Sequence, residues 1–124
     1  MKQEDKELLL KDLSARLPYG VMISYDNGDI IEDRELGLGT LHDFMFNNAK
    51  IKPYLRPMSS MTKEEKIRYK SLCKSRLVTG NIYEKLDTVE SIDYLNSHHF
   101  DYRGLIEKGL AIEVTEENNP YKNE

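Results

Sequence analysis

The densest group of side chains capable of chemistry lies late in the chain, in the run HHFDYRG over residues 98–104. Two imidazoles, a carboxylate, a phenol and a guanidinium fall within six positions, a mixture that occurs in acid–base sites, metal sites and binding surfaces. The candidate residues in this run are His98, His99, Asp101, Tyr102 and Arg103.

The spacing of this cluster argues against a metal site. Adjacent histidines on a helix point roughly 100° apart, so His98 and His99 do not chelate together as an i, i+4 pair would. Acid–base catalysis also needs a nucleophile or a substrate pocket, and the sequence indicates neither. We therefore predict no metal and no cofactor, and we expect a helix C-terminus here or a partner-binding surface. An enzyme with His98, His99 and Asp101 as acid–base groups is the alternative.

A second candidate segment is Tyr54-Leu55-Arg56, which lies between Pro53 and Pro57. Proline on both sides predicts an extended segment at the edge of a sheet and restricts the backbone around the guanidinium. A pre-ordered guanidinium suits bidentate contacts with carboxylate or phosphate. Together with residues 98–103, this segment forms the predicted contact surface.

The charge of the chain is uneven. Eighteen Lys and Arg against twenty-two Asp and Glu give a net charge of −4, which excludes a generally basic nucleic-acid coat or a polybasic membrane binder. Residues 51–80, however, carry eight basic and two acidic groups, a net charge of +6. This stretch is either a site for an anion or acidic partner, or a solvated face neutralised by the acidic residues 81–124. A nucleic-acid-binding protein using residues 51–80 is thus a further alternative.

Length and residue counts limit the architecture and the cell compartment. The 124 residues suffice for one domain, which we place at 1–114, followed by a frayed acidic tail over 115–124. The single cysteine excludes an intrachain disulfide, and the sequence has no apolar run of the roughly 18–20 residues that span a bilayer. Because acidic residues precede the first leucines, we expect no secretory segment. We expect a cytoplasmic protein without a membrane contact.

The first half of the chain predicts a helix followed by a hairpin. Leucines at i, i+4 and i+8 indicate an amphipathic helix over residues 1–17, with Arg16 and the lysines on other faces. A strand over 21–25 leads to Asn27-Gly28, a pair that accepts the two positive φ values of a tight hairpin turn. Residues 40–48 fit a helix or a strand, and we favour a strand that turns into 50–52.

The second half predicts two helices and a strand. Thr62 and Glu65 have the spacing of a capping box, which starts a helix extending to about residue 76. Asp87 and Glu90 open a second helix that ends near residues 98–99, and a strand follows over 110–114. The predicted fold class is α+β, with an N-terminal helix, a small antiparallel sheet around the Asn-Gly hairpin, two further helices and a C-terminal strand.

Three sequence blocks carry a resemblance that covers most of the chain. These are LPYGV over 17–21, IKPYLRPMSSMT over 51–62 and HHFDYRGLIEKGLA over 98–111. Together they resemble a group of small proteins of gut Bacteroidetes and of their phages and prophages. No activity is assigned to this group, so the resemblance transfers no catalytic residue.

The resemblance implies a context for the function. Small accessory proteins of phages most often act by binding, to a host protein or to a signalling ligand. The resulting hypothesis is a non-enzymatic accessory protein, phage- or mobile-element-encoded, that binds a host protein or a small anionic ligand. Its predicted contact surface combines Tyr54, Leu55 and Arg56 with residues 98–103.

Overall fold

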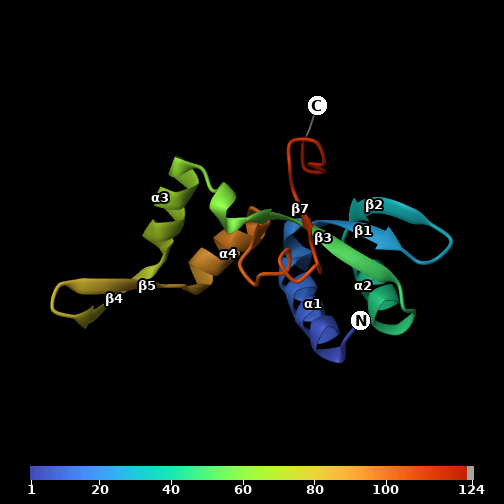
Figure 1. Cartoon of the computed structure of the whole chain (residues 1–124), viewed down its shortest axis with the longest axis horizontal. Coiled ribbons are helices and arrows are strands. Elements are labelled where there is room, and N and C mark those ends of the chain that lie inside the picture. The colour runs from blue at the N-terminus through green and yellow to red at the C-terminus, as the bar shows by residue number, and fades with distance from the viewer. Residues whose placement is uncertain (123–124) are drawn as a thin grey trace.

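The computed structural model describes residues 1–122 and has the mixed α+β fold that the sequence predicts. Its elements are spread along one long axis, with β4 and β5 at one end and β1, β2 and α2 at the other (Figure 1). In chain order they are α1 (Gln3–Arg16), η1 (Leu17–Tyr19), β1 (Met22–Asp26), β2 (Ile31–Glu35), α2 (Leu38–Phe46), β3 (Lys50–Pro57), η2 (Met58–Ser60), α3 (Lys63–Leu72), β4 (Lys74–Thr79), β5 (Ile82–Leu86), α4 (Val89–Ser97), β6 (Phe100–Asp101) and β7 (Ile112–Glu113).

Strand β3 lies at the centre of the main sheet. It pairs antiparallel with β1, which in turn pairs with β2, and it pairs in parallel with the two-residue strands β6 and β7. The prediction of an edge strand around Pro53 and Pro57 is therefore wrong. The two prolines are accommodated because Pro53 precedes the stretch paired with β7, and Pro57 is the last residue of the strand.

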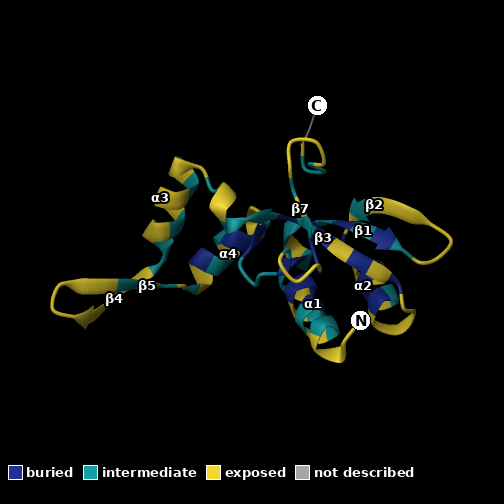
Figure 2. Ribbon diagram, in the orientation of Figure 1, coloured by how far each residue is buried: buried dark blue, intermediate teal, exposed yellow. Residues whose placement is uncertain are grey.

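The core forms between this sheet and α1. Leu9 and Leu13 of the helix are fully buried with Ile23 and Ile51 of the sheet, as the leucine spacing predicts. The helix gives way to η1, and Gly20 follows with φ 69°, a conformation that glycine adopts without strain. Figure 2 shows the buried residues concentrated where α1, β1 and β3 meet.

The Asn27-Gly28 hairpin is present, but its turn differs from the tight two-residue form. Four residues separate β1 from β2, and of the Asn-Gly pair only Gly28 has a positive φ. The Asn27 side chain instead accepts hydrogen bonds from the amides of Asp29 and Ile30. The side chain of asparagine thus shapes a longer loop by itself.

Residues 40–46 are helical, so the predicted strand is wrong there. Helix α2 buries Thr40, Leu41 and Phe44 on one face and leaves Phe46 exposed. A strand would have placed Leu41 and Phe44 on opposite faces of the sheet, so only the helix lets both reach the core. The neighbouring prediction of a strand at 50–52 is confirmed as the start of β3.

Helix α3 begins with the predicted capping box and ends earlier than predicted. The Thr62 side chain accepts from the Glu65 amide, and Glu65 accepts from the Thr62 amide. The helix stops at Leu72 rather than near residue 76, because residues 74–79 pair with β5 as a hairpin. The run Leu77-Val78-Thr79 favours a strand, and the Gly80-Asn81 turn brings β5 back alongside it.

The last third of the chain adds α4 and two short strands to β3. Helix α4 has the predicted position, but its capping box joins Thr88 to Ser91 instead of Asp87 to Glu90. The predicted C-terminal strand is present as β7, shorter than the expected 110–114. The tail expected over 115–124 extends past the described residues, because its last two positions lie outside them.

The helices of residues 1–122 are too short or too polar to cross a membrane.

Candidate functional site

The structure brings the two predicted segments together. Strands β3 and β6 run parallel with Arg56 opposite Phe100, and the Arg56 amide donates a 2.8 Å hydrogen bond to the His99 carbonyl. This pairing joins residues more than forty positions apart in the sequence. The predicted contact residues on the two segments are therefore neighbours in space.

Arg56 holds helix α3 against the body of the protein. Its guanidinium donates to both carboxylate oxygens of Glu65, at 2.8 and 2.7 Å, and lies over the Phe100 ring at 4.2 Å from the centroid. These hydrogen bonds lower the pKa of the Glu65 carboxyl to about 2. The bidentate geometry expected for this guanidinium is thus realised with a carboxylate of the same chain.

His98 lies beside this ion pair. Its Nδ1 is 3.8 Å from Glu65 Oε2, and its ring packs on Tyr94 with centroids 4.3 Å apart. The imidazole is exposed, whereas the Glu65 side chain is mostly covered. Arg56, Glu65 and His98 therefore form a cluster at the first turn of α3, which we call the root of α3. His98 is its most solvent-accessible member.

His99 faces a different neighbour. Its ring stacks on Tyr121 with centroids 3.9 Å apart and planes 9° from parallel, and its backbone has φ 63°. Burial and the nearby positive charge of Arg16 lower the pKa of His99 to about 4, so the ring is neutral at pH 7. The two imidazoles therefore belong to separate clusters.

Asp101 and Tyr102 form hydrogen bonds that fix the chain after α4. The Asp101 carboxylate accepts hydrogen bonds from the amides of Leu105 and Ile106, both at 2.9 Å. The Tyr102 hydroxyl donates to the Asn96 side chain at 2.9 Å. Asp101 thus fixes a turn, and it does not share a site with either histidine. Within residues 1–122 no group of three or more His, Cys, Asp or Glu is arranged to hold a metal ion.

Tyr54 and Leu55 have equally defined surroundings. Leu55 is fully buried in the core. The Tyr54 hydroxyl donates to Asp33 of β2 at 2.8 Å, and burial together with this hydrogen bond raises its pKa to about 12. Of the predicted contact residues, His98 is the most exposed, while Arg56, Tyr102 and Arg103 are partly covered.

A buried charge cluster was missed by the sequence reasoning. Arg16, expected on a solvent face, is fully buried and donates to Asp12 at 2.7 Å and to the Phe100 carbonyl at 2.6 Å. Arg103 Nε is 3.3 Å from the other Asp12 oxygen, close enough for an ion pair but not oriented for a hydrogen bond. Burial raises the pKa of Asp12 against the opposing effect of Arg16. The cluster ties α1 to β6.

Tyr121 was also missed, because it follows the predicted end of the domain. Its hydroxyl accepts from the Met22 amide at 2.9 Å and donates to the Tyr54 carbonyl at 2.7 Å. It therefore bridges β1 and β3 next to the last pair of their ladder, Ile23 opposite Pro53. The sequence signal is weak, since a lone tyrosine in an Asn-rich acidic segment has no periodic partner.

The basic segment extends away from the core. We call residues 63–86, which comprise α3, β4 and β5, the basic arm. None of residues 63–86 is buried, and Figure 2 shows the arm as exposed along most of its length. It carries seven basic and three acidic residues, a net charge of +4, against −8 for the rest of the chain.

Internal pairing neutralises little of this charge. Within the arm, Arg76 pairs with Glu84. Glu65 forms its ion pair with Arg56, which lies outside the arm. The other six cations are exposed and have no ion-pair partner among residues 1–122: Lys63, Lys66, Arg68, Lys70, Lys74 and Lys85. The basic stretch is therefore a cationic surface, and among the acidic residues of 81–122 only Glu84 forms an ion pair with it.

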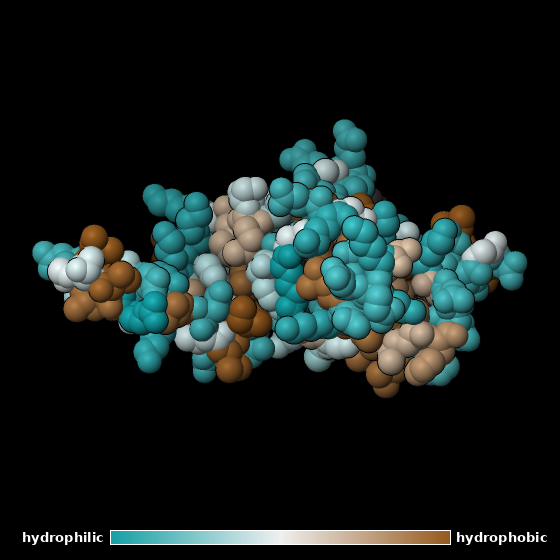
Figure 3. All heavy atoms as spheres, turned by 60° about the horizontal axis from the view of Figure 1, so that its bottom comes forward, coloured by the Kyte–Doolittle hydropathy of each residue, from teal (hydrophilic) through white to brown (hydrophobic). Residues whose placement is uncertain are grey.

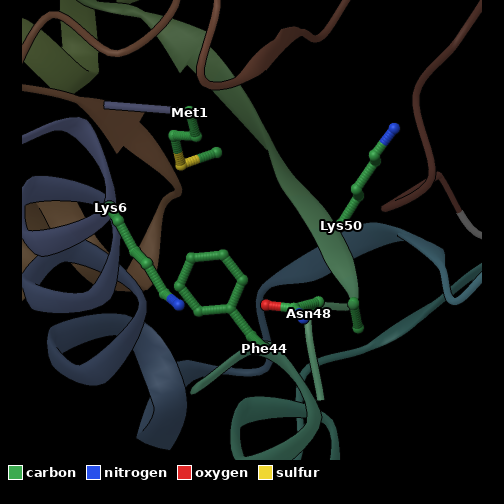
Figure 4. A pocket seen from close by; sticks show the side chains of 6 residues that line it. Met1, Lys6, Phe44, Asn48 and Lys50 are labelled. Atoms are coloured by element: carbon green, nitrogen blue, oxygen red, sulfur yellow. The ribbon is translucent and has the colours of Figure 1, made fainter. Parts of the chain in front are cut away.

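An open hollow of about 260 Å³ lies far from these residues, beside the N-terminal end of α1. Figure 4 shows Met1, Lys6, Phe44 and Asn48 around it. The Lys6 ammonium lies 5.8 Å from the centre of the Phe44 ring. The predicted contact residues do not line this hollow.

The chain matches no family model, and neither the curated proteins nor the solved structures include a significant match to it.

Proposed function

We propose that the protein is a non-enzymatic binding module that engages an acidic partner through the basic arm. The observation that carries this proposal is the exposure of six unpaired cations on a segment that buries no side chain. A folded segment that adds nothing to the core of its own domain is expected to serve a contact outside it. Because the arm has a net charge of +4, the complementary surface of the partner is negatively charged.

The arrangement of α3 supports this assignment. Lys63, Lys66 and Lys70 lie at i, i+3 and i+7 and so share one face of the helix, with the 62% exposed Ile67 between them. This face combines positive charge with an apolar centre, as protein-binding surfaces commonly do. The bidentate pair of Arg56 with Glu65 holds the opposite side of the helix and fixes its orientation.

Two of the sequence-predicted contact residues, Arg56 and His98, belong to the root of α3. Arg56 and His98 position α3, and the exposed His98 ring extends the surface toward the body. The resemblance of the three sequence blocks to phage and prophage proteins supports an accessory role in the cytoplasm, with a host protein as the partner.

Nucleic acid is the second candidate ligand, because phosphate also binds lysine and because Tyr83 on the arm is 64% exposed for stacking. The charge of −8 on the rest of the chain disfavours it, since an extended polyanion that reaches the body is repelled. An acidic protein surface of limited size avoids this repulsion, so we favour it.

Fluorescence anisotropy with a labelled Glu/Asp-rich peptide and with labelled duplex DNA tests the proposal. The triple variant Lys63→Ala/Lys66→Ala/Lys70→Ala is expected to bind the peptide about tenfold more weakly, because exposed ion pairs contribute about 0.2–1 kcal/mol each. The matched control, Lys2→Ala/Lys11→Ala/Lys108→Ala, removes the same charge from exposed positions outside the arm.

Equal losses in the two triple variants would attribute binding to net charge and overturn the assignment to the arm. DNA binding that is tighter than peptide binding, and that falls with salt by about 0.9 log units per log unit for each phosphate contact, would identify nucleic acid instead.

A further inference from the structure

Strand edges are free at both ends of the molecule, and in the hairpin of β4 and β5 each strand has one. Strand β2 pairs only with β1, and β4 pairs only with β5, within residues 1–122. Figure 1 places the two hairpins at the two ends of the long axis. A free edge presents unpaired N–H and C=O groups, to which another strand can add. Because the edges lie so far apart, one molecule cannot join them to each other.

The two edges carry opposite charge. Strand β2 has the sequence IEDRE, with three carboxylates and one guanidinium. Its Arg34 pairs with Glu32 of the same strand. Asp33 and Glu35 are the acidic residues of the other face, where Asp33 also accepts a hydrogen bond from Tyr54. Strand β4 has the sequence KSRLVT, with two cations and no carboxylate. The acidic end of one molecule is thus complementary to the basic end of another.

One antiparallel register matches these residues in detail. Setting Arg76 opposite Asp33 also sets Lys74 opposite Glu35 and brings Val78 near Ile31. Side chains alternate along a strand, so the pairs at Lys74 and Arg76 lie on one face of the combined sheet. Lys74 and Glu35, which have no ion-pair partner within residues 1–122, therefore form a new ion pair, and Arg76 lies between Glu84 of its own hairpin and Asp33 of the second copy. Val78 is the extra residue of the irregularity in β4 between Leu77 and Thr79, so it adds apolar surface at this end of the alignment without a regular cross-strand pair.

Exposed apolar side chains on β2 and β4 also favour a contact that buries them. Ile31 is 76% exposed on β2, and Val78 is 55% exposed on β4. Figure 3 shows apolar side chains at the end formed by β4 and β5, and again at the opposite end of the molecule. A two-stranded hairpin that buries no side chain is marginally stable in water, and further strands stabilise it. Addition of β2 would supply them.

We infer that β4 of one copy adds antiparallel to β2 of a second copy, so that the chain associates head to tail. The inference goes beyond the proposed function: the host partner contacts α3 of the basic arm, whereas β4 of the same arm contacts a second copy. The two contacting surfaces differ, so the contact is heterologous and generates a ring or an open chain of copies.

Light scattering coupled to size-exclusion chromatography tests this on the purified full-length chain. The wild-type mass is expected to rise above that of the monomer with concentration, and to return to it at high salt, because the contact is partly electrostatic. The variants Lys74→Glu/Arg76→Glu and Asp33→Lys/Glu35→Lys are each expected to remain monomeric where the wild type associates, since like charges then meet.

Mixing the two double variants in equal amounts provides the decisive measurement. The basic arm of the second variant meets the acidic β2 of the first, and the acidic arm of the first meets the basic β2 of the second. Association is therefore expected to return in the mixture. The control Lys11→Glu/Lys108→Glu reverses two exposed charges elsewhere and is expected to associate as the wild type does.

Three results would overturn the inference: a wild type that is monomeric at every concentration, association that survives the reversal of Lys74 and Arg76, or no regain on mixing. Far-UV circular dichroism reports whether the variants fold, and the single reversals Lys74→Glu and Glu35→Lys repeat the test with the Arg76–Glu84 ion pair and the Tyr54–Asp33 hydrogen bond intact. Peptide binding by a wild type that stays monomeric would retain the proposed function and reject head-to-tail association.

Discussion

The buried pair of Asp12 and Arg16 makes a strong prediction about stability. Both side chains are fully covered, and Arg16 donates one hydrogen bond to Asp12 and one to the Phe100 carbonyl. Replacing Arg16 by methionine keeps much of the volume but removes both hydrogen bonds and the compensating charge. The Asp12 carboxylate is then left buried with Arg103 as its remaining cationic neighbour.

The size of the effect follows from this loss. Removing one partner of a buried ion pair costs about 3–5 kcal/mol. Because Arg103 lies 3.3 Å from Asp12 and offsets part of the charge, we expect the lower end, about 3 kcal/mol. With a urea m-value of about 2 kcal/mol/M for a small domain, the unfolding midpoint should fall by about 1.5 M. Urea titration followed by circular dichroism measures this shift.

Two further measurements separate charge from packing. The double variant Asp12→Leu/Arg16→Met removes both charges and is expected to be more stable than Arg16→Met alone. The cost of Arg16→Met should also shrink between pH 7 and pH 5. Loss of the Arg16 charge raises the already raised pKa of Asp12 further, so the folded state takes up a proton more readily as the pH falls.

The reasoning would be refuted by an Arg16→Met variant within about 1 kcal/mol of the wild type. A double variant no more stable than the single one would show that packing, and not the unpaired charge, sets the cost.

Three other features give separate predictions. Tyr121→Phe should lower the free energy of unfolding by about 1–2 kcal/mol, because the Met22 amide and the Tyr54 carbonyl lose their shared hydroxyl. His99→Asn should flatten the pH dependence of unfolding between about pH 6.5 and 4. Its folded pKa of about 4 means that the wild type loses stability as the pH falls through this range. Thr62→Ala should raise amide hydrogen exchange in the first turn of α3, at a cost of about 1 kcal/mol.

Each of these has an outcome that contradicts it. Wild-type stability of Tyr121→Phe in urea would mean that the two strands do not depend on the hydroxyl. An unchanged acid limb in His99→Asn would assign the pH dependence to other groups. Uniform exchange in Thr62→Ala, with the first turn no faster than the rest of α3, would show that the cap does not hold the helix end.

Much of the fold follows from local sequence patterns. The leucine spacing of α1, the Asn27-Gly28 loop and the capping box at Thr62 each specify an element through residues within about eight positions of one another. Where two local patterns competed, the sequence reasoning failed. Residues 40–46 are helical because Leu41 and Phe44 both reach the core, and residues 74–79 are a strand because β5 pairs with them.

The candidate site divides in the same way. The sequence alone identified Arg56, His98 and the basic stretch, because charge and residue type are visible without a fold. Only the tertiary structure showed that Arg56 is held by Glu65, that His98 and His99 face different neighbours, and that Arg16 is buried. These contacts join segments distant in the chain, where no periodic pattern links the partners.

The sequence by itself therefore determined which groups exist, their local helix and turn signals, and the +6 charge of residues 51–80. The tertiary structure decided which of those charges are neutralised and which remain free. The reason is physical: whether a charge is solvated, paired or buried depends on what the fold places within a few ångströms of it. For residues 63–86 the fold places little there, and six cations stay exposed.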